Sequence, residues 1–196
     1  MTLVSRLIEL ILLSLRDPAA ALAALRQTGA TPRESWQAIL VAASVGAVLS
    51  WLVLRIMPPP EPGAMSDLAG QPIVMAALQV AAAGLFAVLM ARVGKIFGGT
   101  GGFTDALLAT AWIEIAMLAI QIPQLLLTVL VPPLGGLVGL LTFALYFVLA
   151  VQMTRAVHGF RSPLIVAVGL LGTVFVAGFV LSVMAAMLGI LPEGPA

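Results

Sequence analysis

Five long apolar runs follow one another along this 196-residue chain, and they limit its fold more than any other feature. A helix that crosses a membrane needs roughly 20 mostly apolar residues to cover about 30 Å of hydrocarbon. Hydrophobic residues make up 62% of the chain and charged residues 9%, whereas about half of an ordinary soluble domain is apolar. We therefore predict an all-α integral membrane protein, a five-span transmembrane helical bundle with spans near 36–57, 73–93, 106–131, 134–157 and 163–191.

Residues that end or begin helices separate these runs. Consecutive prolines at 58–60 cannot continue a helix, and Pro132 with Pro133 predicts a tight turn between the third and fourth spans. Before the first span, Thr31 and Glu34 have the spacing of a capping box, in which each side chain bonds the backbone N–H of the other residue. The first helix of the membrane domain is therefore expected to begin near Thr31.

The basic residues are unevenly distributed between the two ends of the predicted spans. Lys and Arg are retained on the cytoplasmic side of a membrane, and a five-span count places all of them except Arg55 on one side. A four-span or six-span count would divide this set. Together with a composition that favours Ala, Leu and Arg, which is typical of a high-GC bacterium, this predicts a multi-pass protein of the bacterial inner (cytoplasmic) membrane. Its N-terminus is expected in the cytoplasm and its C-terminus in the periplasm.

The segment before the first span is predicted to lie at the membrane surface. Over 2–16, polar residues form a narrow stripe of a helix whose remaining surface is apolar, and Glu9 stands midway. Asp17 and Pro18 then predict the start of a second short helix. A cleavable signal peptide is the alternative, but Glu9 inside the apolar region argues against it. We predict cytoplasmic interfacial amphipathic helices over 1–30 and a five-span membrane domain over 31–196.

Glu114 is the carboxylate predicted to lie well inside a span, where its charged form costs a few kcal/mol. Gln121 follows seven residues later, so the two side chains lie on nearly the same face of the third span, and Gln124 comes next. Gln152 of the fourth span and Gln79 of the second are candidates for the same network. These residues predict an intramembrane polar site.

The role of Glu114 has two interpretations. The functional one is proton or ligand binding in a cavity. The structural one is favoured, because Glu114 lies about two turns from the predicted cytoplasmic end. From there its carboxylate is expected to reach the interface, to pair with Arg92, Lys95 or Arg155, or to form a structural hydrogen bond.

Glycine dominates the loop between the second and third spans. The run 98–102 lacks the Lys-Ser/Thr pair that follows a nucleotide-binding loop, and a span rather than a strand precedes it. Flexible linkage to Thr104, a candidate cap of the third span, explains the glycines better than phosphate binding does. The predicted cytoplasmic loop residues are Arg92, Lys95, Gly98, Gly99, Gly101, Gly102 and Asp105.

Basic side chains at the predicted cytoplasmic surface attract anionic lipid, by up to about 1 kcal/mol each. His158 is interpreted as a surface residue of a turn that contacts lipid headgroups, with titration near neutral pH as the alternative. The candidate headgroup contacts are Arg6, Arg16, Arg155, His158 and Arg161.

Composition also excludes several classes of function. Zero cysteines exclude disulfides and thiolate chemistry, and a single histidine excludes a multi-histidine metal cluster. A net charge of +1 with scattered basic residues gives no surface for nucleic acid. Because the carboxylates are dispersed and no serine has a histidine partner, we predict no catalytic site, cofactor or metal. Five spans also do not divide into the equal halves of an inverted-repeat transporter.

The order of these features resembles the bacterial branch of the Yip domain family, which is related to the eukaryotic Ypt/Rab-interacting proteins. The likeness covers nearly the whole chain and rests on 16–18 (Arg-Asp-Pro), the five spans, and the run 98–106 that leads into the third span. The resemblance implies five spans, a cytoplasmic N-terminus and no enzymatic activity. Eukaryotic relatives bind Rab-type GTPases and shape Golgi and ER membranes. We do not expect that role here, because the chain has neither a long cytoplasmic N-terminal region nor a recognisable GTPase-binding motif.

Two functions are consistent with the sequence. The favoured one is a non-catalytic scaffold or accessory protein of the Yip-like family, which binds membrane lipids, other integral membrane proteins or a second copy of itself. The alternative is a small transporter or channel that uses Glu114, Gln121 and Gln124. Small residues at every fourth position, as over 42–50, allow close helix approach, and packing within the bundle is preferred over dimerisation.

Overall fold

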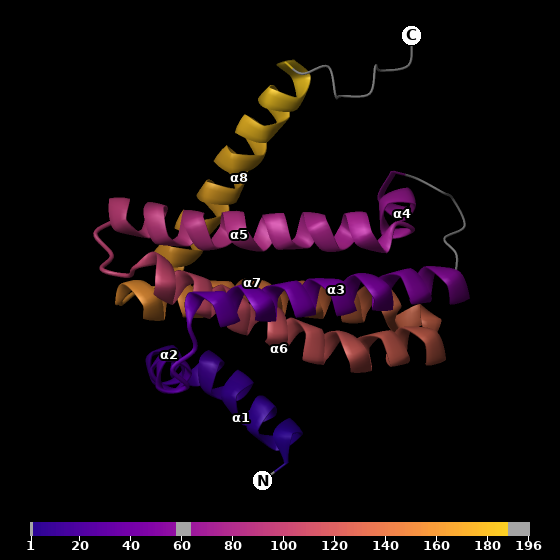
Figure 1. Ribbon diagram of the computed structural model, residues 1–196, viewed down its shortest axis with the longest axis horizontal. Coiled ribbons are helices and arrows are strands. Elements are labelled where there is room, and N and C mark those ends of the chain that lie inside the picture. Colours follow the sequence, from indigo (N-terminus) through magenta and orange to yellow (C-terminus); the bar gives the residue numbers. More distant parts are fainter. Residues whose placement is uncertain (1, 58–63, 188–196) are drawn as a thin grey trace.

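A computed structural model describes residues 2–57 and 64–187, and every regular element in those residues is a helix (Figure 1). Five of the helices are long and apolar enough to cross a membrane, which confirms the predicted all-α bundle. The prolines at 58–60 and the last four residues of the predicted fifth span, 188–191, lie outside the described residues. The elements are α1 (Leu3–Arg16), α2 (Pro18–Gln27), α3 (Pro32–Ile56), α4 (Ala64–Ala69), α5 (Pro72–Ile96), α6 (Phe103–Leu130), the 3-10 turn η1 (Pro132–Leu134), α7 (Gly135–His158) and α8 (Pro163–Met187).

The helix starts follow the local chemistry of the sequence. The capping box before α3 is confirmed: the Glu34 N–H donates to Thr31 Oγ1 at 3.3 Å, and the Thr31 N–H donates to Glu34 Oε2 at 2.7 Å. The Ala20 N–H donates to the Asp17 carboxylate at 3.0 Å and so caps α2. A proline is the first residue of α2, α3, α5 and α8, a position where its missing N–H has no helical partner to lose.

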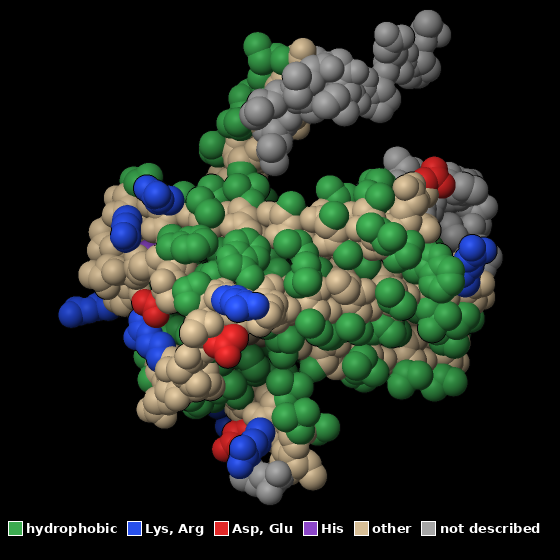
Figure 2. All heavy atoms as spheres, in the orientation of Figure 1, with side chains coloured by type: hydrophobic (Ala, Val, Ile, Leu, Met, Phe, Trp, Pro, Cys, Tyr) green, Lys and Arg blue, Asp and Glu red, His purple; other side chains and the backbone are tan. Residues whose placement is uncertain are grey.

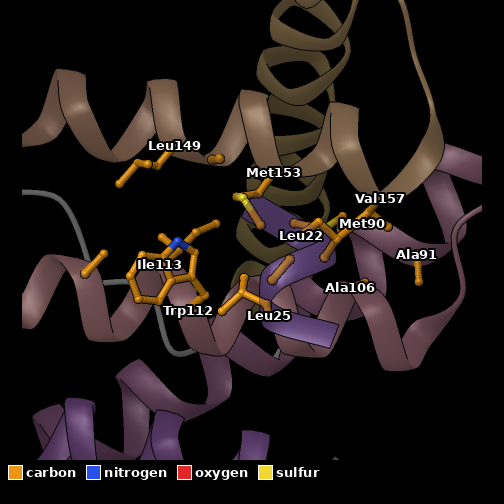
Figure 3. Packing of buried hydrophobic residues seen from close by; sticks show 13 residues of the cluster. Leu22, Leu25, Met90, Ala91, Ala106, Trp112, Ile113, Leu149, Met153 and Val157 are labelled. Carbon is orange, nitrogen blue, oxygen red and sulfur yellow. The ribbon is translucent and has the colours of Figure 1, made fainter. Parts of the chain in front are cut away.

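Four spans, α3, α5, α6 and α7, run side by side, and α2 packs into one end of them (Figure 1). Leu22 and Leu25 of α2 are buried in the same apolar cluster as Met90, Trp112 and Met153 of the spans (Figure 3). The short α2 helix is thus part of the core of the bundle rather than a separate surface layer. Helix α1 continues from it and packs on α7.

Helix α8 leaves the bundle. It contacts α7 near its start and then extends away from the other spans (Figure 1). Among its described side chains, only Val166 is buried, whereas Phe175 and Phe179 expose 77% and 64% of their surface. The fifth span therefore presents apolar side chains on all sides along most of its length.

Candidate functional site

His158 is the last residue of α7 and is buried, with 3% of its surface exposed. Its Nε2 lies 2.8 Å from the carbonyl oxygen of Met90 in α5, and its Nδ1 lies 3.2 Å from the backbone nitrogen of Gly101. Because a carbonyl only accepts and a backbone N–H only donates, these partners assign a neutral ring with its proton on Nε2. The ring also stacks on Phe160, with centroids 5.5 Å apart. The His158 side chain therefore joins α7 to α5, to the loop that precedes α6 and to the loop that follows α7.

Three glycines make room for this ring. A Cβ on Gly94, Gly99 or Gly101 would come to 3.0 Å or closer to an atom of His158, a distance that real Cβ atoms hardly ever reach. Gly98 has a φ of +84°, in the left-handed region that glycine adopts without strain. We call the group of His158, its backbone partners and these glycines the histidine clasp.

The clasp changes the interpretation of the histidine and of the loop. The predicted contact of His158 with lipid headgroups is wrong, because the ring is buried and both of its nitrogens bond backbone groups of the protein. The glycines allow close packing against the ring rather than flexible linkage. The predicted cap is also different, because Gly102 rather than Thr104 is the N-cap of α6. A lone histidine and a glycine-rich loop each gave a signal, but nothing in the sequence pairs them.

An ion pair lies beside the clasp. Arg26 Nε of α2 is 2.8 Å from Asp105 Oδ1 in the first turn of α6, and it is the one ion pair within 2–57 and 64–187. The hydrogen bond to Asp105 raises the pKa of the Arg26 guanidinium. Both side chains remain partly exposed, at 51% and 29%, so the pair contributes about 0–1 kcal/mol.

The other predicted surface cations lie around the same end of the bundle. Figure 2 shows most of the Lys and Arg side chains there and over the N-terminal helices. Arg155 is half-buried, and its bond to Gln152 is described below. The headgroup contacts of the exposed Arg6, Arg16 and Arg161 stay predictions. The predicted loop residues Arg92 and Lys95 are exposed as well.

Two hydrogen bonds fasten α1 to the spans. Trp112 Nε1 donates to Ser14 Oγ at 2.9 Å, and Ser14 is fully buried. Gln152 Nε2 donates to the Leu15 carbonyl oxygen at 3.1 Å, while its Oε1 accepts from Arg155 Nη1 at 2.9 Å. Gln152 therefore anchors the N-terminal helix instead of joining a network with Glu114. Ser14 was not predicted, because one serine among leucines gives no sign of a buried partner far along the chain.

The surface of α1 divides into three sectors. Leu7, Leu10 and Ile11 pack against the core of the bundle. The second sector is a strip of exposed apolar side chains spaced four residues apart, and polar side chains cover the third. The strip consists of Val4, Ile8 and Leu12, exposed at 63%, 52% and 44%. Such a strip remains available to lipid after the helix has docked, as expected for an interfacial helix.

Gln121 faces α3. Its Nε2 donates to the Gly46 carbonyl oxygen at 3.3 Å and to Ser50 Oγ at 3.2 Å. Gln79 Oε1 of α5 is buried at the same junction, 3.8 Å from where a Cβ of Gly46 would stand, and has no hydrogen-bond partner in the described chain. Gln124 is half-buried and, among the described residues, its side chain forms no hydrogen bond. Gln121, Gly46, Ser50 and Gln79 form a polar junction that joins α3, α5 and α6.

Glu114 lies near the middle of α6, 11 residues after Phe103 and so about 16 Å along the helix axis. It is half-buried. The ion-pair form of the structural interpretation is wrong for the described residues, because Arg26 and Asp105 make the one ion pair there and Arg155 bonds Gln152. The predicted polar residues therefore face different neighbours and do not form one site. In the described part of the chain, no three His, Asp or Glu side chains come together as metal ligands.

A family model described as the Yip1 domain matches residues 12–184. The chain belongs to the Yip1 domain family. This membership and the five apolar helices make it a multi-pass membrane protein. No curated protein and no solved structure matches the chain.

The Yip1 match covers the structural features described above. It begins inside α1 and extends into α8, so α2, the histidine clasp and both α1 anchors lie within it. The match crosses the predicted boundary between 1–30 and 31–196, as does the shared core of α2 and the spans. In this Yip1 family chain, helices α1 and α2 and the membrane bundle pack as one unit.

Proposed function

We propose that this Yip1 family chain is a non-catalytic scaffold or accessory protein of a bacterial inner membrane, and that it binds other integral membrane proteins and lipids. The contrast between α8 and the other spans carries the proposal. Beyond its first turns, the described side chains of α8 have no buried contact with the rest of the chain. Gly172 and Gly178 have no neighbouring atom within 4 Å of a Cβ position, and small residues of this kind permit close approach of another membrane helix.

The exposed strip of α1 supports the lipid part of the proposal. A docked helix that keeps a strip of large apolar side chains exposed, next to cationic residues at its polar face, suits the boundary between headgroups and acyl chains. The cationic end of the bundle supports a cytoplasmic location for the same helix. The N-terminus is then cytoplasmic and the end of α8 periplasmic.

Site-specific photo-crosslinking tests the partner-binding role. A photoreactive phenylalanine analogue at Phe175 of α8 should give discrete protein adducts in intact membranes. The matched control is Phe143 of α7, which is 69% exposed on the bundle and should give lipid adducts alone. Two results together would contradict the scaffold role. Crosslinking would give only lipid adducts at both positions, and the protein purified in mild detergent would be a monomer without bound lipid or partner.

Cysteine labelling tests the orientation, and the natural chain supplies no background thiol because it has no cysteine. Cysteines at Thr2 and Lys95 should be protected from a membrane-impermeant maleimide in intact cells. A cysteine at the exposed Gln71, between α4 and α5, should be labelled. Labelling of Thr2 and Lys95 from opposite faces would overturn the five-span orientation.

The mid-span position of Glu114 favours a second function, a small transporter or channel. A carboxyl group in hydrocarbon that has no ion-pair partner in the described chain is costly, and such residues often mark a transport path. Proton flux into proteoliposomes, read by an internal pH dye, tests this idea. Transport by the natural chain that disappears in Glu114→Gln would support it. Equal flux in both proteins, or none in either, would remove it.

A further inference from the structure

Two hydrogen bonds to His158 hold the loop before α6 against the end of α7. The His158 Nδ1 accepts from the Gly101 N–H at 3.2 Å, and the His158 carbonyl oxygen accepts from the Thr100 N–H at 3.4 Å. Gly101 is itself buried. Gly102 follows directly as the N-cap of α6, and its helix end has no side-chain cap. The position of the loop, and with it the start of α6, therefore depends on these bonds.

The protonation state of the ring decides whether the bond from Gly101 exists. Histidine is the side chain whose charge ordinarily changes between about pH 5 and pH 8. In the neutral ring Nδ1 accepts and Nε2 donates, as the Gly101 N–H and the Met90 carbonyl oxygen require. In the protonated ring both nitrogens are donors. The bond to Met90 then survives, whereas at Gly101 two N–H groups face each other.

The clasp cannot accept this second donor in its closed form. The ring is buried, and the backbone of Gly94, Gly99 and Gly101 packs so closely that a Cβ on any of them would come to 3.0 Å or closer to an atom of His158. A buried N–H group without an acceptor is costly. Water can supply that acceptor to Nδ1 only after the loop has moved away from the ring.

The charges around the clasp also oppose a cationic ring in the closed form. Within residues 2–57 and 64–187, Arg26 and Asp105 make the one ion pair, so no carboxylate there lies within 4 Å of a ring nitrogen. The other ionisable side chains on the elements around the ring are cations. They are Arg92 and Lys95 of α5, Arg155 of α7 and Arg161 of the loop that follows α7. A proton on the ring is therefore better tolerated when the clasp is open to water.

We propose that the histidine clasp is a pH-sensitive switch that releases the loop 98–102 from the end of α7. When the pH falls, a proton from water adds to Nδ1 of His158, the bond from Gly101 breaks, and both N–H groups bond water instead. The ring keeps its bond to Met90, so α5 and α7 stay joined while the start of α6 is freed. When the pH rises, the ring returns the proton to water and the clasp closes.

This switch is separate from the scaffold role. It needs no protein partner and no lipid, and it responds to the pH on whichever side of the membrane the clasp lies. The crosslinking result at α8 and the result of the pH experiment can therefore fail independently.

Two measurements on the natural chain in detergent test the switch. The chain has one histidine, so in protein without a histidine tag, nitrogen NMR of isotopically labelled histidine reports His158 alone. The ring should be neutral with its proton on Nε2 at about pH 8 and cationic at about pH 5. Hydrogen exchange of the Gly101 amide, corrected for the intrinsic effect of pH on exchange, reports the release of the loop.

The size of the exchange effect follows from the uptake of one proton. The open clasp gains a proton that the closed clasp excludes, so protection of the Gly101 amide should fall about tenfold for each pH unit below about 6.5. The internal control is the Val131 amide, which bonds the Leu127 carbonyl oxygen at the other end of the bundle. Its protection should stay constant. A ring that becomes cationic while Gly101 keeps its protection would overturn the proposal, and so would equal protection at about pH 5 and about pH 8.

His158→Asn separates protonation from the loss of the ring. The Asn side-chain oxygen replaces Nδ1 as an acceptor but does not titrate, so exchange at Gly101 should lose its dependence on pH. Arg161→Gln is the matched control, because it changes an exposed cation of the adjacent loop and should keep that dependence. If His158→Asn is not monodisperse, the two measurements on the natural chain decide. A pH dependence that persists in His158→Asn would assign it to another group and contradict the switch.

Discussion

The two ends of the bundle are held together differently. At the clasp end, α2, α5, α6 and α7 bury a dense cluster that includes Leu22, Met153 and Val157 (Figure 3). At the opposite end, around η1, the large apolar residues are exposed, including Leu130 at 77% and Leu140 at 64%. The far end is held mainly by contact between the spans and by the hydrogen bonds of Gln121.

This difference follows from the solvent on each side. Apolar side chains gain little by leaving lipid for the protein interior, because lipid is as apolar as they are. Near the membrane surface, where water is present, burial of apolar surface stabilises a structure by about 25 cal/mol per Å². Helices α1 and α2 add their own apolar residues to the core at that end. We therefore expect the clasp end to dominate the free energy of unfolding.

The largest expected effect is that of His158→Ala. The substitution removes a buried ring and leaves the Gly101 N–H without its acceptor. The cavity and the unpaired group together should lower the free energy of unfolding by about 3–5 kcal/mol. Thermal unfolding in detergent measures this loss. The control is Arg161→Ala at an exposed position of the same turn, which should change stability by about 0.5 kcal/mol or less. Similar losses in both variants would contradict the clasp.

Gly94→Ala should come next. Its new Cβ would clash with the His158 ring, and such overpacking costs about 1–3 kcal/mol. Gly139→Ala is the matched control, since a Cβ there meets no atom within 4 Å and alanine favours a helix by up to about 1 kcal/mol. The two substitutions should thus shift the unfolding temperature in opposite directions. Equal shifts would show that the ring does not require glycine at this position.

Ser14→Ala tests how firmly α1 is attached at the clasp end. It leaves the buried indole N–H of Trp112 without an acceptor, at a cost of about 1–3 kcal/mol. Much of that cost should be relieved by local detachment of α1. Hydrogen exchange should therefore accelerate in α1, while the backbone around His158 keeps its protection. Unchanged exchange in α1 would show that this hydrogen bond does not hold the helix.

The span pattern was predictable from sequence because each span is a local property. Twenty apolar residues in a row and the proline and capping signals decide where a helix runs, whatever surrounds it. The capping box of Thr31 and Glu34 and the helix start at Asp17 and Pro18 were predicted in this way and are confirmed. The Yip family resemblance rested on the same local features and their order.

The candidate site was less predictable because it depends on which faces meet. The glycine run and His158 lie far apart in the sequence, and no local rule brings a loop onto a ring. Gln121 and Glu114 share a helix face, yet Gln121 bonds Gly46 of α3, whereas Glu114 forms no ion pair within the described residues. Helical spacing fixes the direction of a side chain on its own helix, but not the neighbour that receives it.

Gln121→Leu should have the smallest effect, and it tests whether hydrogen bonds contribute little at the end of the bundle around η1. It removes the hydrogen bonds to Gly46 and Ser50, and such bonds between membrane helices average about 0.6 kcal/mol. Leucine fills similar space, so the free energy of unfolding should fall by less than about 1 kcal/mol. Gln124→Leu is the control, because in the described chain the side chain of Gln124 forms no hydrogen bond. The free energy of unfolding could instead fall by more than about 2 kcal/mol for Gln121→Leu and not for Gln124→Leu. The polar junction would then stabilise the end around η1 as strongly as packing stabilises the clasp end.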